Sequence, residues 1–153
     1  MLKLELAQIG SIVMPMSKEP VHIYKDSAEL LKSLEEWKHR LYLDSWIICA
    51  GKHDKEDYPD ENGHIEFDVS SQTAKLTLLD PWVDDRIEKH YQEEVLVHEL
   101  LHLKIGFLKP PENMEGTFFD VMQHRLVYQM AHSLIMAKYN LTPEWFRNDE
   151  RCR

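Results

Sequence analysis

Cysteine and cationic side chains are both scarce in this sequence. The 153 residues include two cysteines, and 27 acidic residues stand against 18 lysines and arginines, which gives a formal net charge of −9. Cys49 and Cys152 lie far apart in the chain and do not suggest a disulfide framework, so we expect a reducing compartment. The acidic balance argues against a nucleic-acid backbone or an anionic membrane as the main partner.

Long apolar runs are absent as well. No stretch resembles a transmembrane helix, and residues 1–16 lack the basic region and long apolar stretch of an export signal, so we expect a cytoplasmic protein. Hydrophobic residues make up 43% of the chain and charged residues 29%, which is ordinary for a globular protein. A chain of 153 residues can bury one sizeable core, and we predict a single domain over residues 1–153.

The most informative pattern that is present is H-E-x-x-H, at His98-Glu99-Leu100-Leu101-His102. Residues four apart lie one above the other on a helix, so both imidazoles can bind one zinc ion. Glu99 can then reach the metal-bound water and act as general base, as in zinc metalloproteases. A chance match somewhere in this chain has a probability of about 5%.

The residues around the motif predict a helix from about Asp84 to Ile105, with Gly106 as its stop. Apolar side chains occupy much of its circumference, so we expect this helix to be buried. Buried histidines and a buried glutamate need partners, because unpaired buried polar groups are costly, and a metal ion supplies such partners. The context therefore favours a genuine zinc site over a coincidental match.

The remaining patterns predict an α+β protein with its sheet before the motif helix. Residues 46–51 are typical of a buried strand, and residues 64–69 and 74–79 of half-buried strands, in a mainly antiparallel three-stranded sheet. The polar stretch 52–63 does not fit the spacing of a calcium-binding loop, and it is typical of a solvated hairpin loop.

Helices are predicted both before and after these strands in the sequence. The N-terminal helix begins at Ser27, and a second long helix covers residues 117–139, followed by a tail that packs back on the body. The apolar stripe of the N-terminal helix consists of Leu30, Leu31, Leu34, Trp37 and Leu41.

A third zinc ligand is expected, because catalytic zinc usually has three protein ligands and an open position for water. The extended motif with a third histidine is absent, since Ile105 and Leu108 occupy its Gly and His positions. The ligand must therefore come from the chain after Gly106.

The candidates for this third ligand are His124, Glu115 and Asp120. His124 lies at the edge of the apolar stripe of the second long helix, so it points inward but towards a cleft. Asp120, one turn earlier, could instead orient His124 or form a capping box with Thr117. Ligand type and direction favour His124 over the other two. His132 is predicted on the polar side of this helix, as a solvated histidine.

Residues 37–134 resemble small, mostly phage- and prophage-encoded metallopeptidases with a minimal zincin fold. Such proteins are similar to the minimal gluzincins, in which a Glu on the following helix is the third ligand; His124 stands at that position, so this chain departs from that type. Gly116-Thr117-Phe118-Phe119 resembles a segment of SprT-like proteases, which would favour Glu115. The matching segments are the helix ending near Trp37, residues 46–48, 65–68, 74–78 and 97–103, and the later helix with Ala131 and Leu134.

The predicted function is zinc-dependent hydrolysis of a peptide bond in a peptide or protein substrate. Zinc lowers the pKa of its bound water and polarises the scissile carbonyl, and Glu99 passes the water proton to the leaving amine. Tyr128 is the nearest candidate for stabilising the oxyanion, with core packing as its alternative role. The resemblance to zincins implies that residues 74–79 lie along the cleft edge, where a peptide can add as an extra strand.

Two other functions fit the same sequence. The chain could be a non-catalytic zinc-binding or interaction protein of phage origin, which four protein ligands around the metal would favour. It could also be a regulatory protease that cleaves a phage repressor, which shares the chemistry and differs only in its substrate. An open metal position beside a cleft would favour an enzyme.

Overall fold

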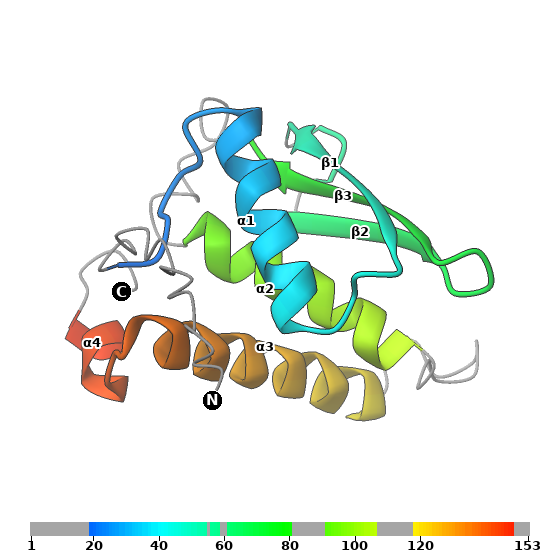
Figure 1. Ribbon diagram of the computed structural model, residues 1–153. Coiled ribbons are helices and arrows are strands. Elements are labelled where there is room, and N and C mark those ends of the chain that lie inside the picture. Colours follow the sequence, from blue (N-terminus) through cyan, green and yellow to red (C-terminus); the bar gives the residue numbers. More distant parts are fainter. Residues whose placement is uncertain (1–18, 55, 59–60, 81–90, 107–117, 149–153) are drawn as a thin grey trace, which may run out of the picture.

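The computed structural model describes residues 19–54, 56–58, 61–80, 91–106 and 118–148, with the side chains of Asp120 and residues 146–148 left out. Its architecture is α+β, as predicted, with all three strands before the motif helix (Figure 1). In chain order the elements are α1 (Ser27–Arg40), β1 (Ile47–His53), β2 (Gly63–Asp68), β3 (Thr73–Leu79), α2 (Gln92–Ile105), α3 (Phe118–Tyr139) and α4 (Pro143–Asn148).

The sheet is mixed, with the strand order β1–β3–β2. β2 pairs with β3 in antiparallel fashion, and β1 pairs with β3 in parallel. The prediction of a mainly antiparallel sheet was therefore wrong. The prediction of a hairpin at residues 52–63 was also wrong. This stretch connects the two outer strands, β1 and β2, and the antiparallel hairpin is instead formed by β2 and β3. Alternating hydrophobicity identifies strands but does not order them.

Strand order also decides which strands are exposed. β1 is an outer strand whose Ile47 side is open to solvent, with that residue 67% exposed, so the prediction of a buried strand at residues 46–51 was wrong. β3 is the central strand and is buried from Leu76 to Leu79. Residues 74–79 therefore cannot offer a free edge, contrary to expectation; within the described residues, the free edges belong to β1 and β2.

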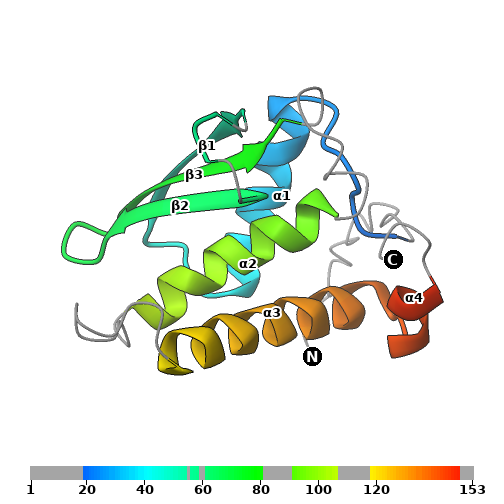
Figure 2. The same ribbon diagram turned by 180° about the vertical axis from the view of Figure 1, so that it is seen from behind.

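Helices α1 and α2 pack against the sheet, and α3 lies on the side of α2 that faces away from the sheet (Figures 1 and 2). The N-cap of α1 is Asp26, whose side chain accepts a hydrogen bond from the Glu29 amide. Leu31, predicted in the apolar stripe of α1, is 46% exposed because only one side of the helix is covered. The core joins all these layers through Leu30, Leu34, Trp37, Leu76, Leu78, Leu96, Leu100, Val127, Ala131 and Ile135.

The motif helix α2 is shorter than predicted. It begins at Gln92, because Tyr91 has an extended backbone (φ −82°, ψ 123°); the predicted residues 84–90 lie outside the described residues. The expected burial is confirmed, since most of its side chains are buried. The second long helix is also confirmed as α3, and Trp145 of the tail packs against the core.

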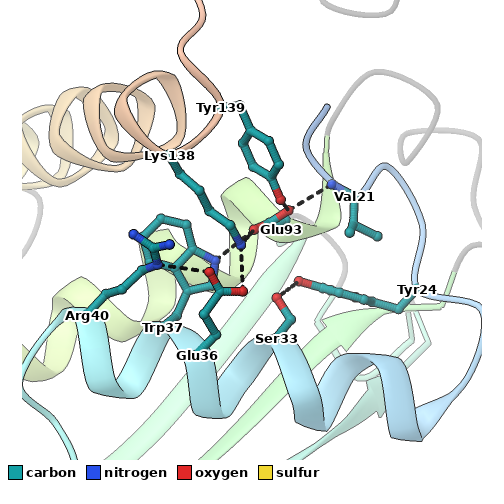
Figure 3. A network of polar contacts seen from close by, with 9 residues as sticks. All are labelled: Val21, Tyr24, Ser33, Glu36, Trp37, Arg40, Glu93, Lys138 and Tyr139. Carbon is teal, nitrogen blue, oxygen red and sulfur yellow. Dashed lines mark hydrogen bonds and ion pairs between the residues drawn. The ribbon is translucent and has the colours of Figure 1, made fainter. Parts of the chain in front are cut away.

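The first turn of α2 carries a buried carboxylate, that of Glu93, which is 0% exposed (Figure 3). Its Oε1 accepts from Trp37 Nε1 at 2.8 Å and from Lys138 Nζ at 2.7 Å. Its Oε2 accepts from the Val21 amide at 2.8 Å and from the Tyr139 hydroxyl at 2.6 Å. Burial and the hydrogen bond to Glu93 raise the pKa of Tyr139, which keeps the phenol a donor. One carboxylate therefore joins α1, α2, α3 and the segment before α1.

No helix among the described residues combines the length and the apolar character needed to cross a bilayer.

Replacing Glu93 with Gln should lower the free energy of unfolding by about 3–5 kcal/mol, because the substitution leaves the buried Lys138 ammonium with less compensating charge. Urea denaturation would measure the change. Glu35→Gln is the matched control, because Glu35 also pairs with a lysine, Lys38, but its side chain is 68% exposed. The control should stay within about 1 kcal/mol of wild type. Equal losses in the two variants would contradict the role of Glu93.

Candidate metal centre

The structure brings His98, His102 and His124 together between α2 and α3. The Nε2 atoms of His98 and His102 are 3.2 Å apart. One ring nitrogen from each of the three histidines lies within 4.8 Å of the other two. Within the described ranges, this is the group of histidine, cysteine and acidic side chains that could hold a metal ion. Of the sequence candidates, His124 therefore converges with the motif.

The packing of α2 against α3 positions these rings. The α3 side chains Val127, Ala131 and Ile135 are fully buried at the core, which places His124 at the edge of the packed face as expected. A second link lies further along the same two helices, where His132 Nδ1 contacts Glu94 Oε1. His132 was predicted as solvated, and this was wrong, because the largely buried Glu94 side chain on α2 reaches it.

Burial differs among the three histidines. His98 and His102 are half-buried, whereas His124 is exposed, so the group opens to solvent on the α3 side. Burial, with a contribution from His102 and His124, lowers the pKa of His98 to about 3. His98 is therefore neutral at physiological pH and keeps a nitrogen lone pair available for a metal ion.

Glu99 lies on a different face of α2, the face towards β2. It is 7% exposed, and among the described residues no hydrogen bond reaches its carboxyl group. Burial raises the pKa of Glu99 to about 8, and the carboxylate of Glu61 adds to the rise. A carboxyl group with a pKa raised to about 8 can exchange a proton near neutral pH.

The other sequence candidates are placed less fully. Glu115 lies outside the described residues, and Asp120 lies in α3 without a described side chain, so their possible roles as ligands stay predictions. Tyr128 is 48% exposed, and its ring centroid is 6.5 Å from that of His98. It lies beside the cluster, which is compatible with its predicted role in catalysis but does not test it.

Sequence reasoning missed Gly63. Gly63 was included in the hairpin loop predicted over residues 52–63, but it is the first residue of β2, where it lies against Val95 and Glu99 of α2. A glycine on the helix-facing side of a strand was the available signal, since such a glycine often marks a close approach of another element.

Comparison with known proteins found no matching family model, curated protein or solved structure. The function is therefore inferred from the geometry of the site.

In the metal-free protein, the free energy of unfolding of Glu99→Gln should rise relative to that of the wild type as the pH rises from about 5 to 8. The pKa of Glu99 is about 8 when folded and 4.5 ordinarily. In this window, folded Glu99 holds a proton that the unfolded chain has lost, so the wild-type stability falls with pH, by at most about 1.4 kcal/mol per pH unit. Gln lacks this dependence.

The measurement is urea denaturation of both proteins at several pH values with a chelator present. The titration of His98, whose depressed pKa weakens the fold as the pH drops below about 6.5, is common to both proteins and cancels in the difference. A difference in stability that does not change with pH would contradict the raised pKa of Glu99.

Proposed function

We propose that this protein is a zinc-dependent metallopeptidase in which His98, His102 and His124 hold the ion. The observation that carries the proposal is that three histidines converge on one side of α2 while Glu99, adjacent in sequence to His98, is buried with no hydrogen bond among the described residues. Two helical faces thus supply a ligand set and a proton acceptor, which are the two parts that metal-assisted hydrolysis needs.

The donor set is suited to zinc. Imidazole nitrogens are common zinc ligands, and three of them form a known type of catalytic site with an open fourth position. Two nitrogens bound at about 2.0–2.1 Å in tetrahedral geometry are about 3.3 Å apart, close to the 3.2 Å between His98 and His102. The exposed position of His124 supports access from solvent.

The residues of the chain would divide the reaction between them. Zinc, when bound, would lower the pKa of water and polarise a peptide carbonyl. Glu99 would take a proton from the attacking water at its carboxylate and return it to the leaving amine. The low exposure of Glu99 would keep bulk water away from this proton transfer.

The expected substrate is a peptide in an extended conformation. β2 is an outer strand, and its first residue, Gly63, lies against Glu99. A peptide that pairs with the free edge of β2 would pass close to the proposed general base. We therefore assign to β2 the pairing with a peptide substrate that the resemblance had suggested for residues 74–79. The proposed place of action is the cytoplasm.

A non-catalytic zinc protein is the second candidate. A structural zinc site commonly has four protein ligands, whereas the group in the described residues has three members. That count favours the enzyme. The third candidate, a protease that cleaves a phage repressor, uses the same site and requires no different arrangement.

The metal proposal predicts about one zinc per chain, measured by elemental analysis after removal of metal and dialysis against zinc. Alanine at His98, His102 or His124 should abolish or strongly weaken binding, because each removes one of three ligands. The matched control is His39→Ala, since His39 is an exposed histidine that pairs with Asp44 away from the cluster. Retention of zinc by His124→Ala, together with its loss in Glu115→Ala or Asp120→Ala, would overturn the choice of third ligand.

The enzyme proposal predicts that Glu99→Gln keeps its zinc but loses cleavage of fluorescein-labelled casein by about 10²–10⁴-fold, because the amide cannot accept the water proton. Labelled peptide release and zinc content would be measured on the same samples. Glu35→Gln is the control, since Glu35 is a carboxylate on α1 whose side chain is 68% exposed and which the proposal does not place in the site. Zinc binding without cleavage by the wild type, across a mixed peptide library as well as casein, would favour the non-catalytic alternative.

A further inference from the structure

We propose that Gly63 is a positioning residue for the proposed general base: the absence of a side chain at this point of β2 lets the Glu99 carboxyl group occupy its place between α2 and β2. This inference rests on the proposed function and adds a specific structural requirement to it.

The packing at Gly63 leaves no room for a Cβ atom. Such an atom would lie 2.5 Å from Val95 Cγ1, 3.1 Å from Glu99 Cγ and 3.2 Å from Glu99 Oε1. The first distance is shorter than real Cβ contacts allow, and the other two are tighter than about nine in ten of them. Val95 and Glu99 are one turn apart on the same face of α2. Any side chain at residue 63 would therefore push on both.

β2 cannot easily retreat from this contact. Gly63 is paired with Leu78 in the antiparallel ladder, and the carbonyl of Asn62 accepts a hydrogen bond from the Leu79 amide at 2.9 Å. Leu78 and Leu79 belong to the buried central strand. Because its pairing with β3 holds β2 in place, the side chains on α2 must move when a Cβ atom is added to Gly63.

Glu99 is the side chain most free to move. Among the described residues no hydrogen bond holds its carboxyl group, so its rotamer depends on the surfaces that it touches. Gly63 is next to one of these surfaces, since a Cβ atom added to it would lie 3.1 Å from Glu99 Cγ. A displacement of about 1 Å at a catalytic group can cost about 10²-fold in rate.

The test uses four variants of the zinc-loaded full chain: Gly63→Ala, Val95→Ala, the double variant, and Gly51→Ala as the matched control. An added Cβ at Gly51 on β1 meets nothing within 4 Å. We expect Gly51→Ala to behave as wild type. Gly63→Ala should keep its zinc and lose at least about tenfold in kcat on labelled casein, with a smaller change in KM.

The double variant separates packing from catalysis. Val95→Ala removes the tightest contact. Gly63→Ala should therefore lower the melting temperature less when it is added to Val95→Ala than when it is added to the wild type. Turnover should stay low, because the contacts of the new Cβ with Glu99 at 3.1 and 3.2 Å persist. Wild-type kcat in Gly63→Ala, or recovery of kcat together with stability in the double variant, would overturn the proposal.

A crystal structure of the double variant gives a readout that does not depend on turnover. We expect the Glu99 carboxyl group to be displaced relative to wild type while the three histidines stay in place. An unmoved Glu99 would refute the positioning role even if the wild type proved to be active. A displaced Glu99 in the double variant, together with a wild type that binds zinc but cleaves nothing, would support the positioning of Glu99 by Gly63 and refute the proposed function.

Discussion

The carboxylate of Glu93 is the interaction on which the arrangement of the helices depends. A fully buried carboxylate is unfavourable unless its lone pairs and its charge are satisfied. Here four donors come from the segment before α1, from α1 and from α3, and Lys138 supplies the opposite charge. Moving any one of these segments away would leave the buried carboxylate without at least one of its hydrogen-bond donors. The network therefore fixes α3 relative to α2, and with it the distance between His124 and the two motif histidines.

Three faces of one helix carry three different functions. Leu96, Leu100 and Leu103 fill the core, the two motif histidines face α3, and Val95 and Glu99 face β2. The spacing of the motif produces this division, since positions 98 and 102 share a face and position 99 lies about 100° away from position 98. The packing of α2 between β2 and α3 therefore places each of these groups against a different neighbour.

Local patterns predicted the parts of the structure that depend on neighbouring residues. The convergence of His98 and His102 follows from helix geometry, and the inward edge of α3 was enough to favour His124 among three candidates. The order of the strands could not be derived this way, because alternation gives the faces of a strand but not its neighbours. Residues 74–79 were wrongly expected at a free edge of the sheet because the order of the strands was not known.

The failures at His132 and Gly63 have a common cause. Each depends on a side chain from a distant element, Glu94 for the histidine and Glu99 for the glycine, that no periodicity within the same element reveals. Glu93 shows the same limit, since its partners lie at residues 21, 37, 138 and 139. Composition and periodicity describe Glu93 and Glu94 as charged positions in the first turn of a helix, and only the tertiary packing shows which distant side chains they contact.

The spread of the Glu93 partners along the chain has a consequence for biosynthesis. Polypeptides emerge from the ribosome starting at the N-terminus, so α2 leaves the tunnel before Lys138 and Tyr139 do. Until those two residues are available, burying the first turn of α2 would leave its carboxylate without its counter-charge. The helix that bears His98 and His102 therefore reaches its final position only after Lys138 and Tyr139 have been synthesised, so the packing of α2 follows the synthesis of α3.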